Sequence, residues 1–225
     1  MRSPSYRLVD VSHWMEDYTF AGNPKVEAQG PFNRVWGDLR ENVYDLALCT
    51  QSGTHVQGPH YFWEEGKRLD ELPLHLFEGE AIILDLPLGE VASRADIQGA
   101  LEEVESPRPP IVILRTGWMD RLLYGPPASP GEARASLSLE AATYLAESYE
   151  ATMVAVDAPG VEPPQAARFE VTRYLSRRGV LLLEGLVGLD QLRHRRVFLE
   201  AFPLKLRGVE GSPCRAVIKE PLTVS

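Results

Sequence analysis

The chain has 225 residues, 44% of them apolar, and a formal net charge of −9. A chain of this length and composition can bury a sizeable core, and we expect one domain over residues 1–225. The negative charge argues against nucleic acid and anionic membrane as partners. The sequence also holds no run of about 20 apolar residues that would span a bilayer.

The cysteine content and the first residues indicate in which cellular compartment the protein is expected. The two cysteines, Cys49 and Cys214, are too few for a disulfide framework. Residues 1–4 lead directly into a strand-like segment and lack the apolar run of a signal peptide. We therefore expect a protein of the reducing cytoplasm.

Apolar patterns near the start predict two strands separated by a loop. Residues 6–12 predict the first strand. His13 follows this strand, where a lone histidine is more often a structural hydrogen-bonding residue than a catalytic one. Residues 22–33 are rich in Gly, Asn and Pro, which is typical of a loop. Residues 44–49 predict the second strand.

Continuous apolar runs of strand length follow, and such runs are typical of strands buried on both faces of a sheet. These runs are residues 81–86, 111–118, 152–156 and 180–186. Helical spacing and capping residues predict helices over residues 93–101, 137–148 and 169–178. The last strands are predicted at residues 199–206 and 216–218, with a turn at residues 211–213. This alternation of strands and helices predicts an α/β fold.

The stretch over residues 50–62 has an unusual polar content. It contains two of the five histidines, two glutamines, three Thr or Ser hydroxyls and a Gly-Pro pair. Burying such groups unpaired would cost about 1–3 kcal/mol for each group. We therefore expect the stretch to present polar side chains at the mouth of a pocket.

This stretch resembles the signature of the cyclase family that includes bacterial kynurenine formamidase and isatin hydrolase, His-x-Gly-Thr-His-x-Asp-x-Pro-x-His-Phe. The chain keeps Gly53, Thr54, His55, Pro59 and Phe62. Further segments that resemble family motifs lie at residues 115–118, 157–162 and 211–215. The resemblance implies an α/β single domain with a mixed central β-sheet or partial barrel flanked by helices, of the swivelling β/β/α kind.

The resemblance also implies which residues stand at the metal-ligand positions. In the family, two divalent metals are held by two early His, a bridging Asp, a later His and a Glu. Here Gln51 stands at the first His, Gln57 at the bridging Asp and Thr172 at the later His, whereas His55 and Glu184 keep ligand-type side chains. A neutral amide is a poor zinc ligand, and a catalytic zinc site needs three protein ligands. We therefore expect no cofactor; the alternative is a single Zn or Mn at His55.

The replacements at these positions predict a neutral polar pocket in which side chains move protons. Tyr61 stands at the last His of the signature, and it can form an acid–base pair with a nearby His if its pKa shifts from about 10. Without a metal, Glu184 should pair with a cation or rise in pKa. A raised Glu184 beside His55 is a candidate general base, although the two can instead pair structurally. We predict that His55, Tyr61, Glu184 and His60 are catalytic.

Other side chains are predicted to bind substrate, because amides bind carbonyl groups and indoles can line an aromatic pocket. These residues are Gln51, Gln57, Thr172, Trp63, Trp118 and Trp14. For Trp118, a place in the core is an equally good explanation.

Three functions stay open at this point. The first is a metal-independent enzyme that catalyses acid–base ring closure, ring opening or dehydration of a small carbonyl-rich substrate, such as a polyketide or a lactone. The second is a metal-dependent amidohydrolase of the arylformamidase type, and the third is a non-catalytic binder of small molecules. The resemblance also implies a homodimer or homotetramer.

Overall fold

The computed structural model describes residues 5–15, 26–102, 104, 107–125, 134–163, 166 and 168–222. Its strands are β1 (Tyr6–Asp10), β2 (Glu27–Trp36), β3 (Leu39–Ala47), β4 (His55–Gln57), β5 (Glu78–Asp85), β6 (Val91–Ala92), β7 (Ile111–Arg115), β8 (Ser136–Leu137), β9 (Met153–Val156), β10 (Leu181–Glu184), β11 (Arg196–Glu200), β12 (Gly211–Pro213) and β13 (Val217–Pro221). Its α-helices are α1 (Arg94–Glu102), α2 (Trp118–Tyr124), α3 (Leu139–Thr143) and α4 (Glu170–Arg177). Short helical turns are η1 (Pro59–Tyr61), η2 (Leu69–Glu71), η3 (Leu74–Leu76), η4 (Tyr144–Ser148) and η5 (Leu189–Gln191). Among the described residues, no helix combines the length and apolar character needed to cross a membrane.

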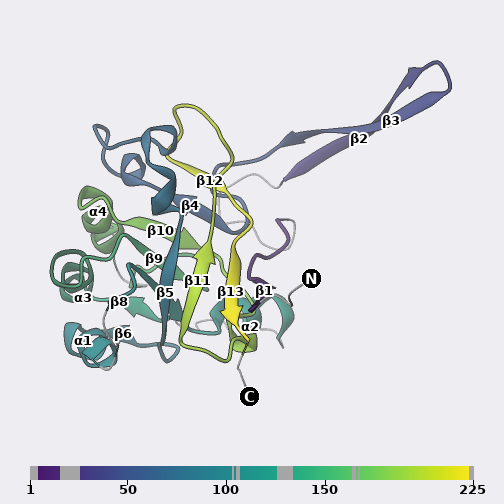
Figure 1. Ribbon diagram of the computed structural model, residues 1–225. Helices are drawn as coiled ribbons and strands as arrows, with labels where there is room; N and C mark the ends of the chain where they lie inside the picture. Colours follow the sequence, from purple (N-terminus) through teal and green to yellow (C-terminus); the bar gives the residue numbers. More distant parts are fainter. Residues whose placement is uncertain are drawn as a thin grey trace.

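Most of the strands form one mixed sheet in the order β1-β13-β11-β5-β7-β9-β10-β4-β12 (Figure 1). The central strands β5, β7, β9 and β10 run parallel. Antiparallel strands flank them on both sides. The expected α/β class with a mixed, partly barrel-like sheet is therefore confirmed.

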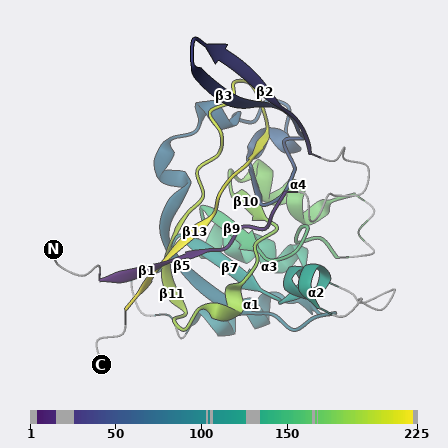
Figure 2. The same cartoon turned by 90° about the vertical axis from the view of Figure 1, so that its right-hand side faces the viewer.

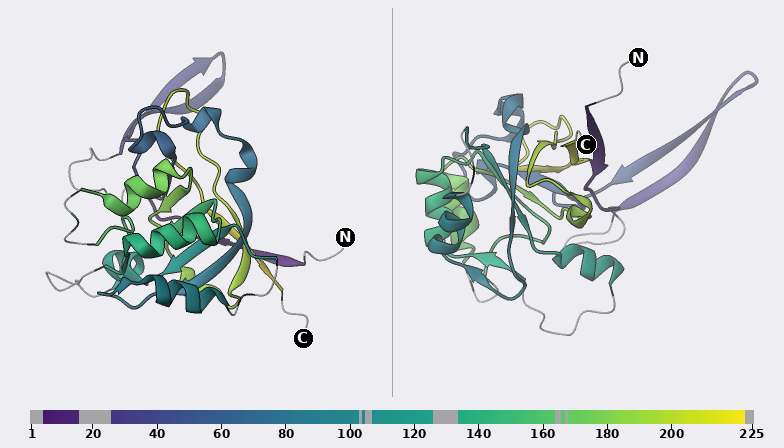
Figure 3. Two further views of the ribbon diagram at one scale, coloured as in Figure 1. Left: turned by 90° about the vertical axis from the view of Figure 1, so that its left-hand side faces the viewer. Right: turned by 60° about the horizontal axis from the view of Figure 1, so that its bottom comes forward.

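Two apolar cores cover the two faces of this sheet. On β5, Ala81 and Ile83 belong to one core, whereas Ile82 and Leu84 belong to the other. The second core lies between the sheet and helices α1, α3 and α4, which Figures 2 and 3 show together on one side of the sheet. Because both faces are covered, the central strands carry continuous apolar runs, as predicted.

Strands β2 and β3 form a separate two-stranded hairpin, residues 27–47, which we call the arm. Figures 1 and 3 show the arm projecting away from the rest of the protein. Its large apolar side chains are between 45% and 68% exposed, namely Phe32, Val35, Trp36, Leu39, Tyr44 and Leu46. The arm therefore exposes a set of large apolar side chains that neither a core nor another element covers among the described residues.

The loop predicted over residues 22–33 is wrong from Glu27 onward, and residues 22–25 lie outside the described residues. Gly30 and Pro31 suggested a loop, but they lie at an irregularity between Gln29 and Phe32 where the register of β2 against β3 shifts. Glycine and proline are tolerated at such bulges of a hairpin. The strand predicted at residues 44–49 belongs to the arm and ends at Ala47.

Other element boundaries also differ from the prediction. The apolar run at residues 111–118 ends as a strand at Arg115, because Gly117 adopts a left-handed φ of 72° and α2 begins at Trp118. The strand predicted at residues 199–206 is β11, which instead covers Arg196–Glu200. Its residues alternate between buried and half-buried, so the strand has no continuous apolar run that would mark its start. The predicted turn at residues 211–213 is the edge strand β12, where Pro213 needs no ladder partner on its outer side.

Candidate active site

The polar stretch after the arm forms β4, which lies between two other strands. His55 pairs with Glu184 on β10 and with Pro213 on β12. Directly opposed residues of antiparallel strands point to the same face of a sheet. His55 and Glu184 therefore share a face with Leu182, which belongs to the core beneath α4, whereas Val56 points to the opposite core.

His55 is fully buried and presents one ring nitrogen to Glu184. Its Nδ1 lies 2.9 Å from the carbonyl oxygen of Gly53, and because a carbonyl only accepts, Nδ1 carries the proton. Its Nε2 lies 3.7 Å from Oε2 of Glu184. Burial lowers the pKa of His55 to about 4, against the opposing effect of the Gly53 hydrogen bond. The imidazole is therefore neutral near pH 7.

Glu184 is also buried and hydrogen-bonded. Its Oε1 accepts a hydrogen bond of 2.7 Å from Nε2 of Gln57. Burial raises the pKa of Glu184 to about 8, with Arg134 opposing the rise and Glu162 adding to it. The carboxyl is therefore protonated near pH 7, so His55 and Glu184 form a neutral pair. Of the two outcomes expected for Glu184, pairing with a cation or a raised pKa, the structure favours the raised pKa.

Tyr61 and His60 lie on η1, which follows β4. Burial raises the pKa of Tyr61 above its usual value of 10, and electrostatic interactions with Glu184 and Glu210 raise it further. The phenol therefore keeps its proton and is a hydrogen-bond donor. Nδ1 of His60 is buried without a hydrogen-bond partner among the described residues.

The predicted substrate-binding residues are placed in different parts of the fold. Gln57 and Gln51 each donate to the carboxyl oxygen of a glutamate, Gln57 to Glu184 over 2.7 Å and Gln51 to Glu210 over 3.2 Å. Thr172 is buried on α4, where its main-chain N–H donates to Glu162 over 2.6 Å.

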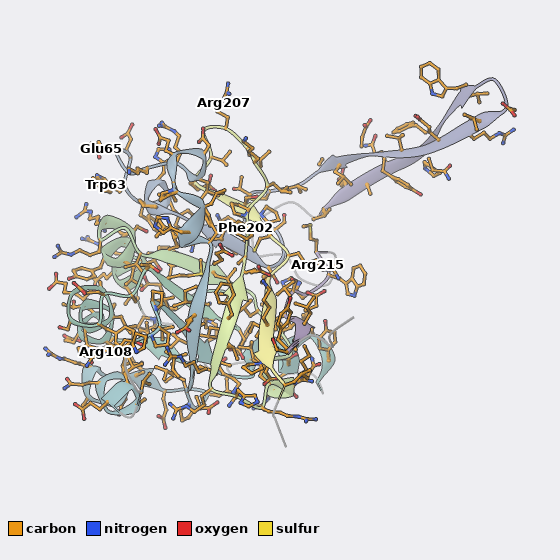
Figure 4. The ribbon with its side chains drawn as sticks, viewed as in Figure 1. Trp63, Glu65, Arg108, Phe202, Arg207 and Arg215 are labelled. Carbon is orange, nitrogen blue, oxygen red and sulfur yellow. The ribbon has the colours of Figure 1, made fainter. Side chains whose placement is uncertain are left out.

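The three tryptophans lie elsewhere in the fold. Trp14 and Trp63 are 74% and 38% exposed, and Figure 4 shows Trp63 at the outer edge of the body beside Glu65. Trp118 packs against the core beneath the helices. A role of these side chains in substrate binding stays a prediction.

Three site residues were not predicted as such: His13, Glu162 and Glu210. His13 is buried, its main-chain N–H donates to Oγ1 of Thr54 over 3.1 Å, and its ring helps to lower the pKa of His55. Glu162 is buried and acts on the pKa of Glu184. Glu210 acts on both His55 and Tyr61. The signal for Glu162 was its place in the motif at residues 157–162 that resembles the family, whereas Glu210 lies just outside the motif at residues 211–215 and had no such signal.

The donor atoms of the site determine whether it fits a metal. His55 and Glu184 are two ligand-type side chains, and Glu184 already accepts the amide of Gln57. Within the part of the chain that the structure describes, no group of three or more His, Cys, Asp or Glu side chains is placed to hold an ion. A catalytic zinc site uses three such ligands. The described side chains therefore do not fit the paired metals that the resemblance implies.

Comparison with known proteins gives consistent matches. Residues 9–163 match the family model described as "Putative cyclase". The kynurenine formamidase of Bacillus cereus is 30% identical over 214 residues, covering 93% of this chain and 92% of that protein. Isatin hydrolase A from Labrenzia aggregata has a TM-score of 0.80 at 22% identity, over 97% of this chain and 95% of that chain. A structure described as a "predicted metal-dependent hydrolase" from Bacillus stearothermophilus has a TM-score of 0.73 at 23% identity, over 96% of this chain and 100% of that chain.

These relatives correct two expectations. They favour the hydrolase over the ring-closing, metal-independent enzyme that we placed first. The expectation of no cofactor is contradicted, because a solved structure with the same fold is described as a metal-dependent hydrolase. That expectation rested on side-chain types at the family's ligand positions alone.

The expected resemblance is confirmed by a family match that covers well over half of the chain. This protein belongs to the cyclase family and is an enzyme of the hydrolase type.

Proposed function

We propose that the protein hydrolyses the amide bond of a small carbonyl-rich substrate, such as an aryl formamide or a cyclic amide. The observation that carries this proposal is the buried pair of His55 and Glu184, 3.7 Å apart. The names of the relatives, kynurenine formamidase and isatin hydrolase, support an amide substrate.

The two residues of this pair have complementary proton states. Nε2 of His55 holds a lone pair and accepts a proton from water as the water oxygen bonds to the amide carbon. The carboxyl of Glu184 gives its proton to the leaving nitrogen as the carbon–nitrogen bond breaks. The resulting imidazolium and carboxylate attract each other, and passage of the proton from His55 to Glu184 restores the starting state.

Tyr61 supplies a further donor. Its phenol stays protonated because burial and electrostatic interactions with Glu184 and Glu210 raise its pKa. A phenolic O–H can donate to the carbonyl oxygen of the substrate and stabilise the negative charge that develops there. No step is routed through a metal, because the described donors do not form a complete ligand set.

The test measures hydrolysis of an aryl formamide and of isatin by the wild type and by two variants, His55→Ala and Tyr61→Phe. Loss of a proton donor or acceptor lowers kcat by about 100-fold or more. Matched controls are Tyr174→Phe, whose hydroxyl donates to Glu147 on the surface, and His75→Ala, which is exposed on η3. We expect both controls to keep wild-type kcat. Absence of hydrolysis by the wild type, or full activity of both site variants, overturns the proposal.

We also propose that the protein is a homodimer or homotetramer in which the arm packs against a second copy. An isolated two-stranded hairpin is marginally stable in water, and the arm exposes Trp36 and Leu39 at 65% and 68%. Light scattering of the variant Trp36→Ser with Leu39→Ser should show a lower mass than the wild type. Leu74→Ser, at a residue that is 71% exposed on η3, is the control and should keep the wild-type mass. A monomeric wild type contradicts the proposal.

A further inference from the structure

Glu210 lies immediately before β12 and is held to the site by its main chain. Its carbonyl oxygen accepts the N–H of Gly58 over 2.8 Å, next to the end of β4. The preceding residues are fixed as well, since Val209 accepts the N–H of Leu69 and Gly208 donates to Asp70. The position of the Glu210 side chain is therefore set by the body of the protein.

The carboxylate of Glu210 binds the turn that leads into β4. Its Oε1 accepts hydrogen bonds from Oγ1 of Thr50 over 2.5 Å and from Nε2 of Gln51 over 3.2 Å. A carboxylate only accepts, so it fixes which end of the Gln51 amide faces it. The amide oxygen of Gln51 therefore points away from Glu210.

Gly211 gives the Gln51 amide the space that this contact needs. A Cβ at this position would lie 2.6 Å from Nε2 of Gln51 and 3.1 Å from the carbonyl oxygen of Val56. Any other residue would push the amide away or displace β4. The contact between Gln51 and Glu210 therefore depends on a glycine at the start of the edge strand β12.

Glu210 is also near the residues that handle protons. Its charge acts on His55 and on Tyr61, which come from β4 and η1. The turn that it binds, residues 50–54, ends directly at His55. Movement of this turn would therefore move the imidazole.

We infer that Glu210 is a positioning residue of the reaction, which orients the amide of Gln51 toward substrate and holds the turn that places His55. This inference rests on the proposed amide hydrolysis. A small displacement of a reacting group lowers the rate by about 10- to 100-fold. Glu210 acts through Gln51 and Thr50 and does not itself exchange a proton with substrate.

The experiment compares Glu210→Gln with the exchange variant Glu210→Gln plus Gln51→Glu, which restores one carboxylate and one amide in reversed order. We expect Glu210→Gln to lower kcat about 10-fold or more, with a KM within a few fold of wild type and unchanged thermal unfolding. The exchange variant holds the turn again but presents a carboxylate in place of the Gln51 amide to substrate, so its kcat should stay low. A merely structural residue would lower the unfolding temperature in Glu210→Gln, and the exchange would restore both that temperature and kcat.

The control is Asp70→Asn, because Asp70 holds the same loop through Gly208 without contacting the amide. We expect wild-type kcat from this variant. Wild-type kcat in Glu210→Gln, or equal losses in the control and the site variant, overturns the inference while the proposed function stands.

Calorimetric titration with isatin separates the two proposals further. If the wild type and Glu210→Gln bind isatin within a few fold of each other, the loss of kcat lies in the chemical step, as the positioning role requires. Binding that weakens about 10-fold or more in Glu210→Gln overturns the positioning role while the proposed function stands. A wild type that neither binds nor hydrolyses isatin or the aryl formamide overturns both.

Discussion

Replacement of Asp157 by alanine tests how the fold holds the end of the central sheet. Asp157 is fully buried and follows β9. Its carboxylate accepts hydrogen bonds from the main-chain N–H of Thr116 over 2.8 Å, from the Thr116 hydroxyl over 2.6 Å and from the N–H of Gly117 over 2.7 Å. Its carbonyl oxygen accepts the N–H of Met119 over 3.0 Å. Asp157 thus joins the ends of β7 and β9 to the start of α2, and its side chain makes the contacts to Thr116 and Gly117.

The expected loss of stability follows from these contacts. A hydrogen bond to a charged group contributes about 1.5–3 kcal/mol. Burial raises the pKa of Asp157, so part of this gain is offset by the removal of the carboxylate from water. Three donors lose their acceptor in Asp157→Ala, and Thr116 and Gly117 are partly buried. We therefore expect the free energy of unfolding to fall by about 4.5 kcal/mol, which is the low end of this estimate, about 1.5 kcal/mol, for each of the three bonds.

Urea unfolding followed by circular dichroism measures this change. Asp85→Ala is the matched control, because Asp85 also ends a strand, but its side chain is 65% exposed and pairs with Arg115 at the surface. An exposed ion pair contributes about 0–1 kcal/mol. If Asp157→Ala loses no more stability than Asp85→Ala, the assigned role of the buried carboxylate is refuted.

Two further predictions concern pH and metal binding. Burial raises the pKa of Glu220, but hydrogen bonds from the N–H groups of His194 and Arg193 outweigh burial and lower the pKa overall. The stability that the lowered pKa contributes is present above about pH 4.5 and is lost as pH falls through the folded pKa. Urea midpoints of Glu220→Gln should therefore change less between about pH 7 and pH 3 than those of the wild type. A variant with Gln51→His, Gln57→Asp and Thr172→His regains the ligand types that the family resemblance implies, so calorimetry should show tighter zinc binding than in the wild type. Equal zinc affinity of the variant and the wild type would contradict the assignment of these three residues to metal-ligand positions.

The central strands were predictable because their signal is local. β5, β7, β9 and β10 are covered on both faces, so each appears in the sequence as an unbroken apolar run. The arm was not predictable in this way. Its apolar residues are exposed and its Gly30-Pro31 pair is typical of a loop, so nothing in the local pattern indicated a projecting hairpin.

The candidate site was predictable where it lies within one stretch of sequence. His55, Gln57 and Tyr61 belong to the same polar segment, and the family resemblance added Glu184 from β10. Glu210 was missed because it is 159 residues from Gln51 along the chain and reaches the site through the pairing of β12 with β4. Contacts of this kind depend on topology, which the local pattern does not contain.

The two glutamines at the family's metal-ligand positions each donate a hydrogen bond to a glutamate, which their residue type alone did not predict. Gln57 donates to Glu184 on one neighbouring strand, and Gln51 donates to Glu210 beside the other. Each exchange of a ligand for an amide therefore also occupies a carboxylate oxygen. Any metal that binds Glu184 has to displace the amide of Gln57 or use Oε2, which faces His55. Metal binding at this site and the neutral pair of His55 and Glu184 thus compete for the same oxygen atoms.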